Sequence, residues 1–376
     1  MGRPNSIGHN LAWLRLDRDV SQDDVSSRAG ISRLTLGKIE RGEVVPRAAT
    51  LEALAKALST STADLVTAVR ALHTVRFRAP KVKGREQILA GVSRWLEDYS
   101  WLERELKEVA QFPLDQLRSE RIKPEGLAKR VRGAMGLNAK EPIRDICGLL
   151  EDNGIKVLLL DKKSDAFFGL SVAEGDGGPA VVVNRWERIS VERWIFTAAH
   201  ELAHLLLHHG EYARDESEEP KQAEHEADAF ASHFLMPEAA FASEWEDTNG
   251  HPLLDRVLKV KRIFRVSYKT VLYRLVESER ATRDVWPIFQ RQHAQRLGKT
   301  LRKADEPNPL KASEFSWNWS RAGEPEAVSE YDFVEDRLHR LVRTALERKV
   351  ISLGRAAEIL RISREQMRQL AADWAA

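Results

Sequence analysis

The sequence predicts a multidomain α+β protein with an all-α first domain, a second α+β domain that holds a small sheet, and a small helical C-terminal domain. Three observations support this. A chain of 376 residues exceeds the roughly 250 to 300 residues at which one hydrophobic core stops growing. Apolar residues recur at helical spacing through most of the chain. Three β-rich runs, IKVLLL, AFFGLSV and PAVVVN, interrupt that pattern between residues 155 and 184.

The composition is that of a globular chain. Hydrophobic residues make up 43% and charged residues 31% of it, a balance that excludes disordered and collagen-like proteins. No apolar run approaches the roughly 18 residues that a membrane span needs, and the N-terminus lacks the apolar stretch of a signal peptide. We therefore expect a cytoplasmic protein with no membrane partner. The net charge of +2 is too small to indicate nucleic-acid binding by itself.

Residues 1–70 are expected to form the first domain, because their apolar positions fit five short helices. Within them, the string SQDDVSSRAGISRLTLGKIERGE predicts a short helix, a tight turn at Gly30 and a second helix capped by Ser32. This is the spacing of a helix-turn-helix, whose second helix enters the major groove of DNA. Four blocks, SQDDV, AGIS, KIERG and LEALAKALSTSTADL, make the segment resemble the lambda-repressor-like (Cro-like, XRE) family.

That resemblance implies a double-stranded DNA operator as partner. By position in the motif, Gln22 and Arg41 would hold phosphates, which positions the domain without selecting a sequence. Arg33, Leu34 and Lys38 would face the bases. Such domains usually bind two half-sites as dimers, so a single copy per chain indicates a possible homodimer.

Residues 71–139 are expected to be a basic linker followed by a helical connector. Five basic residues and no acid lie between 71 and 85. The alternation from Val75 to Arg78 fits either a short strand or a linker. From Arg85 the apolar spacing predicts a long amphipathic helix.

Three further segments follow from the sequence. Residues 140–302 contain the β-rich runs and several helices, 303–328 is proline-rich and polar enough for a linker, and 329–376 is helical again. The only cysteine, Cys147, lies in an apolar helical stretch and is expected to be a buried core residue. In the C-terminal segment, ISLGRAAEILRISREQMRQL predicts two short helices around a tight turn. A role in partner docking or dimerisation and plain packing are equally compatible with it.

The string VERWIFTAAHELAHLLLHHG holds an HExxH pattern on a predicted helix. Residues four apart share a helix face, so the imidazoles of His200 and His204 can bind one zinc ion with Glu201 beside it. This is the chemistry of a zinc peptidase. Since chance gives HExxH in roughly two of a hundred such chains, the surrounding sequence has to decide.

A catalytic zinc ion takes three protein ligands and keeps one position open. In KQAEHEADAFASHFLMP, Glu224 and Asp228 lie four apart on one helix face. We predict Glu224 as the third ligand and Asp228 as the acceptor of a hydrogen bond from a ligand imidazole. Glu226 is the second choice for the ligand. Exposed or packing roles are expected for the other nearby histidines, His208, His209, His225 and His233.

The blocks GLSV, VVVN, HELAHLLLH and EADAFASHFLMP make residues 140–280 resemble the ImmA/IrrE family of metallopeptidases. The resemblance implies a zincin-like fold in which His200, His204 and Glu224 hold zinc, or manganese, and Glu201 is the general base. It also implies a protein substrate, a helix-turn-helix repressor, in a stress-response, prophage or toxin-antitoxin setting. The leading interpretation is thus a transcription regulator fused to a zinc-dependent endopeptidase.

Two other interpretations remain. In the first, the chain is a DNA-binding regulator that uses the metallopeptidase fold to sense a ligand or partner without cutting anything. In the second, the chain is purely an enzyme and its DNA domain is vestigial. The operator, the substrate and the activating signal do not follow from the sequence.

Overall fold

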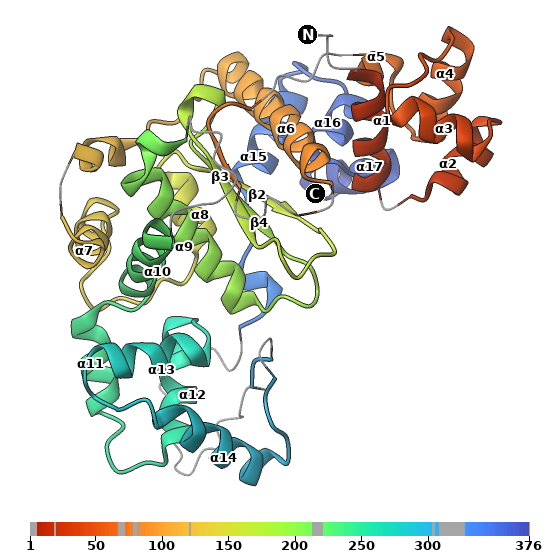
Figure 1. Cartoon of the computed structure of the whole chain (residues 1–376). Coiled ribbons are helices and arrows are strands. Elements are labelled where there is room, and N and C mark those ends of the chain that lie inside the picture. The colour runs from red at the N-terminus through yellow and green to blue at the C-terminus, as the bar shows by residue number, and fades with distance from the viewer. Residues whose placement is uncertain are drawn as a thin grey trace.

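The computed structural model describes residues 6–18, 20–66, 72–77, 82, 84–119, 122–212, 221–302, 305–307 and 328–375. Within these residues the chain consists of helices around one small sheet (Figure 1). Most of the linker predicted at 303–328 lies outside the described residues. Among the described helices, none has both the length and the apolar character that crossing a bilayer requires.

The described part of the first domain folds into five helices, as predicted. They enclose a small core of their own, which includes Val25, Leu36 and Leu54. Gly30 takes the left-handed conformation (φ 65°) between the second and third helices, which confirms the predicted turn. The helices are α1 (Ser6–Asp17), α2 (Gln22–Ala29), α3 (Arg33–Glu40), α4 (Ala48–Ala57) and α5 (Thr62–Val66).

One sheet of four strands lies at the centre of the molecule, in the order β1-β3-β4-β2. The strands β2 and β4 are parallel, and the other two pairs are antiparallel. The strands are β1 (Val75–Phe77), β2 (Lys156–Leu160), β3 (Gly169–Val172) and β4 (Ala180–Asn184).

The sequence indicated about three strands, and the fourth is β1, from the basic segment that fitted either a strand or a linker. Phe77 explains this outcome, because its ring is buried and stacks on Phe167 with centroids 5.0 Å apart. Asp176 holds the start of β1, since its carboxylate accepts hydrogen bonds from the backbone of His73 and Thr74.

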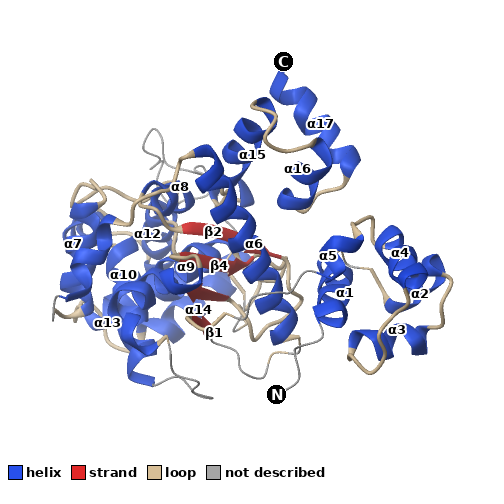
Figure 2. Cartoon of the chain, turned by 90° about the horizontal axis from the view of Figure 1, so that it is seen from above, coloured by secondary structure: helices blue, strands red, loops and turns tan. Residues whose placement is uncertain are grey.

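Helices cover both faces of the sheet. One face packs in a hydrophobic cluster with α6 (Arg85–Leu106) and with the C-terminal helices α15 (Arg337–Glu347), α16 (Leu353–Leu360) and α17 (Arg364–Ala375) (Figure 2). The other face packs on a second cluster. Its first helices are α7 (Pro124–Ala134), α8 (Ile146–Asp152), α9 (Val191–Leu207) and α10 (Lys221–Leu235).

The second cluster extends into four more helices at the lower end of Figure 1. Cys147 on α8 belongs to this cluster and is buried, as predicted, and burial raises the pKa of its thiol well above the usual value. The helices are α11 (Glu238–Glu246), α12 (Leu253–Phe264), α13 (Tyr268–Glu277) and α14 (Val285–Leu297).

The helix α6 joins the first domain and the C-terminal helices to the sheet. The guanidinium groups of Arg94 and Arg361 contact the indole of Trp13 on α1, at 5.2 and 5.1 Å from the ring centroid. A Cβ atom on Gly91 would collide with this indole, so the close approach of α1 to α6 requires glycine there. At the other end of α6, buried Glu103 pairs with Arg337 of α15.

Candidate metal centre and nucleic-acid interface

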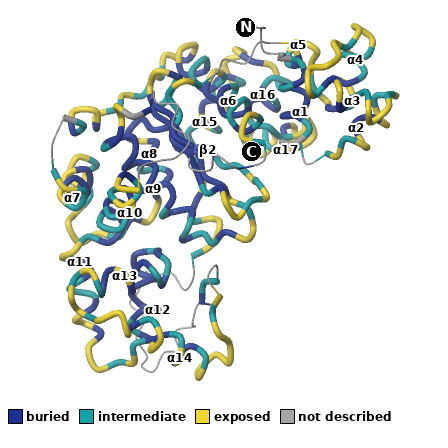
Figure 3. Tube along the Cα trace, in the orientation of Figure 1, coloured by how far each residue is buried: buried dark blue, intermediate teal, exposed yellow. Residues whose placement is uncertain are grey.

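Helix α9 carries the HExxH residues through the interior. Ser190 caps it by accepting a hydrogen bond from the backbone N–H of Arg193. Apolar residues surround the helix because it lies between the sheet and α10, and Figure 3 shows this part of the chain as buried. His200, Glu201 and His204 are each 0% exposed. Such polar groups are stable in a core only when they have partners.

The structure brings the three predicted ligands together. The Nε2 atoms of His200 and His204 lie 2.9 Å apart. The Oε1 atom of Glu224 on α10 lies 3.4 Å from Nε2 of His204 and 3.9 Å from Nε2 of His200. One ligand atom from each residue falls within 4.8 Å of the others, so a single ion can contact all three.

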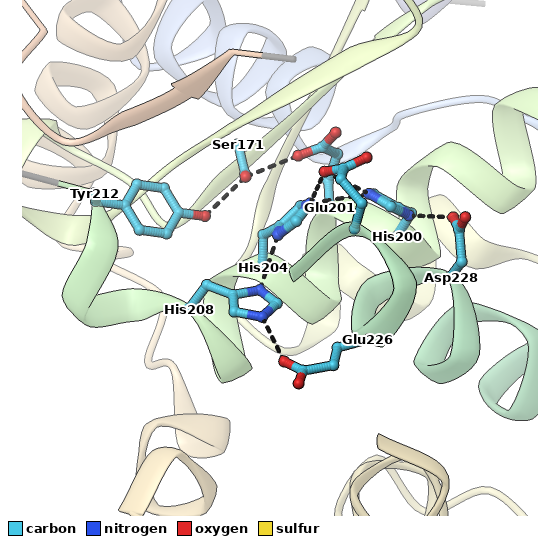
Figure 4. A network of polar contacts seen from close by, with 9 residues as sticks. Ser171, His200, Glu201, His204, His208, Tyr212, Glu226 and Asp228 are labelled. Atoms are coloured by element: carbon cyan, nitrogen blue, oxygen red, sulfur yellow. Dashed lines mark hydrogen bonds and ion pairs between the residues drawn. The ribbon is translucent and has the colours of Figure 1, made fainter. Parts of the chain in front are cut away.

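The outer nitrogens of both imidazoles contact further side chains (Figure 4). Nδ1 of His200 lies 2.8 Å from Oδ1 of Asp228, the contact predicted for that carboxylate. Nδ1 of His204 lies 2.9 Å from Nδ1 of His208, whose Nε2 lies 3.1 Å from Oε2 of Glu226. Because carboxylates only accept, Nδ1 of His200 and Nε2 of His208 carry the protons. With neutral rings, His204 then donates from Nδ1 to His208.

This pattern of protons fits a bound cation. Because His200 and His204 donate from Nδ1, both direct an Nε2 lone pair toward the same point, next to the Glu224 carboxylate. Three electron-pair donors that converge in a buried site repel one another unless a positive charge lies among them. Two imidazoles and one carboxylate form a typical three-ligand set for a catalytic metal ion. The residues present therefore fit a divalent metal ion.

The Glu201 carboxylate is held separately from the ligands. The hydroxyl of Ser171 on β3 donates to its Oε2 atom at 2.8 Å, and the phenol of Tyr212 donates to Ser171 at 2.7 Å (Figure 4). Burial raises the pKa of Tyr212, so the phenol stays protonated and remains a donor. These two consecutive hydrogen bonds, from Tyr212 to Ser171 and from Ser171 to Glu201, thus fix the orientation of the Glu201 carboxylate from the side of the sheet.

Sequence reasoning missed three residues of this network. His208 was expected to be exposed or to pack, but it is buried and contacts His204. The sequence did indicate His208, because it follows His204 by four residues, as His204 follows His200. Ser171 is a polar residue in a fully buried strand, which is itself a sign of a specific partner. For Tyr212 we find no signal in the sequence.

The predicted DNA-contacting residues lie on and around α3. Arg33, Leu34 and Lys38 are exposed, and Leu34 keeps 68% of its surface in solvent. Leu34 lies between Arg33 and Lys38 in the sequence of α3, and an exposed leucine in this setting is better placed to contact a base than to pack in a protein core. Arg33 forms an exposed ion pair with Asp23, and Arg41 forms one with Glu43.

Gln22 has a contact within the domain. Its amide donates to Oε2 of Glu40 at 2.7 Å, and Arg15 pairs with both oxygens of the same carboxylate. Gln22, expected at a phosphate, therefore also ties α2 to α3 through Glu40. Because Arg15 belongs to α1, one carboxylate joins three helices of the domain.

Comparison with known proteins agrees with this geometry. Residues 6–68 match a helix-turn-helix domain family, and residues 150–276 match a peptidase family described as the IrrE N-terminal-like domain. An uncharacterized HTH-type transcriptional regulator of Sinorhizobium fredii is 41% identical over 61 residues, which cover 16% of this chain and 79% of that protein. The chain therefore belongs to the HTH-type transcriptional regulators and joins a DNA-binding helix-turn-helix domain to an IrrE-like domain of a peptidase family.

Proposed function

We propose that the IrrE-like domain is a zinc-dependent endopeptidase that cleaves a helix-turn-helix repressor or an antitoxin-like protein. The convergence of His200, His204 and Glu224, with Glu201 oriented by a separate set of contacts, supports this proposal most directly. The setting would be a stress response, a prophage or a toxin-antitoxin pair. Zinc suits the donor set best, and manganese also accepts imidazole and carboxylate ligands.

In this proposal each residue of the site has a separate role. A bound zinc ion would polarise a carbonyl oxygen and acidify water. Glu201 would accept a proton at its carboxylate and pass it to the leaving amine. Ser171 and Tyr212 keep that carboxylate in place, while Asp228 fixes the ring and tautomer of one ligand imidazole.

The helix-turn-helix domain would place the peptidase at an operator, close to repressors bound to the same DNA. Arg33, Leu34 and Lys38 would contact bases, and Gln22 and Arg41 would contact phosphates once DNA is bound. A homodimer would supply the two copies that a two-fold operator needs.

Cleavage is tested with the purified zinc-loaded chain and its Glu201→Gln variant. Each is incubated with candidate helix-turn-helix repressors, including the chain itself, and the products are analysed by intact-mass spectrometry. We expect the parent to cut and the variant to bind one zinc ion per chain without cutting. Glu187→Gln changes an exposed glutamate in the same way and should cut like the parent. Cleavage by Glu201→Gln at the parental rate would refute the assigned role.

One observation favours the alternative of a regulator that senses without cutting. His200, Glu201 and His204 are fully buried, so a peptide reaches Glu201 only after the site opens. In that case no repressor is cut although zinc is bound, and loading with zinc changes the affinity for DNA. The third interpretation, an enzyme with a vestigial DNA domain, predicts that Arg33→Ala with Lys38→Ala leaves DNA affinity and its salt dependence unchanged.

A further inference from the structure

The C-terminal helices α16 and α17 repeat the geometry of α2 and α3. Ser21 and Ser32 cap the first pair, and Ser352 and Ser363 cap the second pair at the same separation of eleven residues. In each of the four caps, the serine hydroxyl accepts from the backbone N–H three residues later, at 3.1 or 3.2 Å. In both pairs, therefore, the second helix begins the same number of residues after the first.

The turns between the helices also agree. Gly30 and Arg361 each follow the capping serine of the first helix by nine residues. Gly30 has φ 65° and ψ 32°, and Arg361 has φ 59° and ψ 34°. In both turns the next residue is an isoleucine whose backbone N–H donates over 3.0 Å to a carbonyl five residues earlier. Because the turn sets the angle between the helices, both pairs take the helix-turn-helix arrangement.

One position is fully buried in both second helices. Leu36 in α3 and Met367 in α17 occupy the fourth position and are 0% exposed. The segment Ile-Ser-Arg opens both helices, at residues 31–33 and 362–364. The match therefore extends from the backbone to one core position and to the Ile-Ser-Arg segment, although 331 residues separate the two copies.

The outward face of α17 carries side chains suited to base edges. Arg364 takes the position of Arg33, and Gln369 takes that of Lys38. Both are exposed, as are Glu365 and Arg368 beside them. Arginine forms paired hydrogen bonds with guanine, glutamine with adenine, and glutamate accepts from cytosine.

The charge around α17 is also suited to phosphates. A cleft of about 690 Å³ lies between the two helix-turn-helix units, where the N-terminus of α17 faces α2 and α4. Five cations and one acid line it: Arg18, Arg28, Lys56, Arg361, Arg364 and Glu358. Residues 337–375 hold nine arginines and lysines against four acids. Three of these arginines, Arg337, Arg340 and Arg355, pair with acids on or just after α6, and Arg364 and Arg368 of α17 are exposed.

From this geometry we propose that α16 and α17 form a second helix-turn-helix and that α17 binds the major groove of double-stranded DNA. The chain then contacts DNA with two different helices, α3 and α17. The other cations of the cleft, Arg18, Arg28, Lys56 and Arg361, hold phosphates beside α17. One chain recognises a composite site with two unrelated sequence elements.

The test selects binding sites from a library of randomised duplex DNA with the full-length chain. Arg33→Ala with Lys38→Ala disables α3, and Arg364→Ala with Arg368→Ala disables α17. Arg283→Ala with Arg291→Ala removes the same charge from an exposed part near α14 and serves as the matched control. Circular dichroism checks that each variant is folded. Affinity for the selected duplex is then measured across a range of salt concentrations.

We expect two sequence elements in the selected sites. The α17 variant should lose one of them, bind at least ten-fold more weakly and show a smaller salt slope, because two cations are removed from the surface that faces DNA. The matched control should bind like the parent. A single element, lost only in the α3 variant, with affinity and salt slope unchanged in the α17 variant, would overturn the proposal and leave α16 and α17 as a packing or protein-docking unit.

Discussion

At the scale of single residues, the candidate metal centre depends on contacts outside the proposed ligand set. Asp228 and His208 each contact the Nδ1 atom of one proposed ligand imidazole, and both contacts leave the Nε2 atom of that ring to face a bound ion. The ligands were predictable because four-residue spacing on a helix is local. Ser171 lies 30 residues from Glu201 in the sequence, and Tyr212 lies 41 residues from Ser171, and local patterns do not encode such contacts.

We predict that Asp228→Ala lowers zinc affinity by about 10- to 100-fold, because the ring of His200 loses the acceptor that fixes its tautomer. Competition with a chromophoric chelator measures the affinity. His225→Ala alters an exposed histidine on the same helix and should leave the affinity unchanged. An Asp228→Ala affinity equal to that of the parent would mean that the carboxylate does not orient the ligand.

At the scale of elements, the strand β3 must approach α9 closely to place Ser171 beside Glu201. Gly169 permits this, since a Cβ atom there would lie 2.5 Å from Cγ2 of Thr197 and 2.7 Å from the carbonyl oxygen of Val182. The β-rich run predicted the strand. The short distance between β3 and α9 depends on the glycine at position 169, and hydrophobic periodicity does not reveal such a requirement.

Gly169→Ala is expected to lower the free energy of unfolding by about 1 to 3 kcal/mol through overpacking between β3 and α9. It should also weaken the proposed peptidase activity by moving Ser171. Urea denaturation gives the stability. Gly133→Ala, in a helix and with open space around the new methyl group, is the control and should be neutral or slightly stabilising. Equal stability for Gly169→Ala and the parent would show that the strand relaxes without cost.

The junction of α8 and α15 should make stability depend on pH. Oε2 of Glu151 accepts from the backbone N–H groups of Asp336 and Arg337 at the start of α15. Burial outweighs these contacts and raises the pKa of Glu151 from 4.5 to about 7. The folded chain therefore keeps a proton that the unfolded chain loses, and this contribution to stability falls as the pH rises from about 4.5 to 7.

Glu151→Gln cannot ionise and removes that dependence. We expect the stability of the variant relative to the parent to increase between pH 5 and pH 8, as measured by urea denaturation at several pH values. The difference between the two curves isolates this residue from other titrating groups. A difference that stays constant across the range would place the pKa of Glu151 near its ordinary value instead.

At the scale of the whole molecule, the hydrophobic cluster on α6 crosses the boundaries drawn from the sequence. It combines β1 and α6 from residues 71–139, strands from 140–302 and helices from 329–376. Periodicity predicted the elements but not their association, because Arg337 and Glu103 are 234 residues apart in the chain. The two family matches, at 6–68 and 150–276, cover the parts that local motifs had already indicated.

Removing residues 329–376 should therefore destabilise the rest of the chain. The deletion exposes the apolar side of α6 and leaves the buried pair of Glu103 and Lys156 without Arg337. We expect a lower melting temperature and increased binding of a hydrophobic dye. Light scattering would show in addition whether the segment contributes to a dimer. A truncated chain that melts like the parent would show that the segment is an independent appendage.

Helix α6 contacts the first domain near one end, through Gly91, and α15 near the other, through Glu103. Its buried side lies on the sheet that carries α9 on the opposite face. With 22 residues it is a rod about 33 Å long. Arg361, in the turn between α16 and α17, donates a hydrogen bond to the carbonyl oxygen of Gly91, so the first domain and the α16–α17 unit are anchored at the same end of this rod. Their spacing on a DNA duplex is therefore set by contacts with one rigid helix.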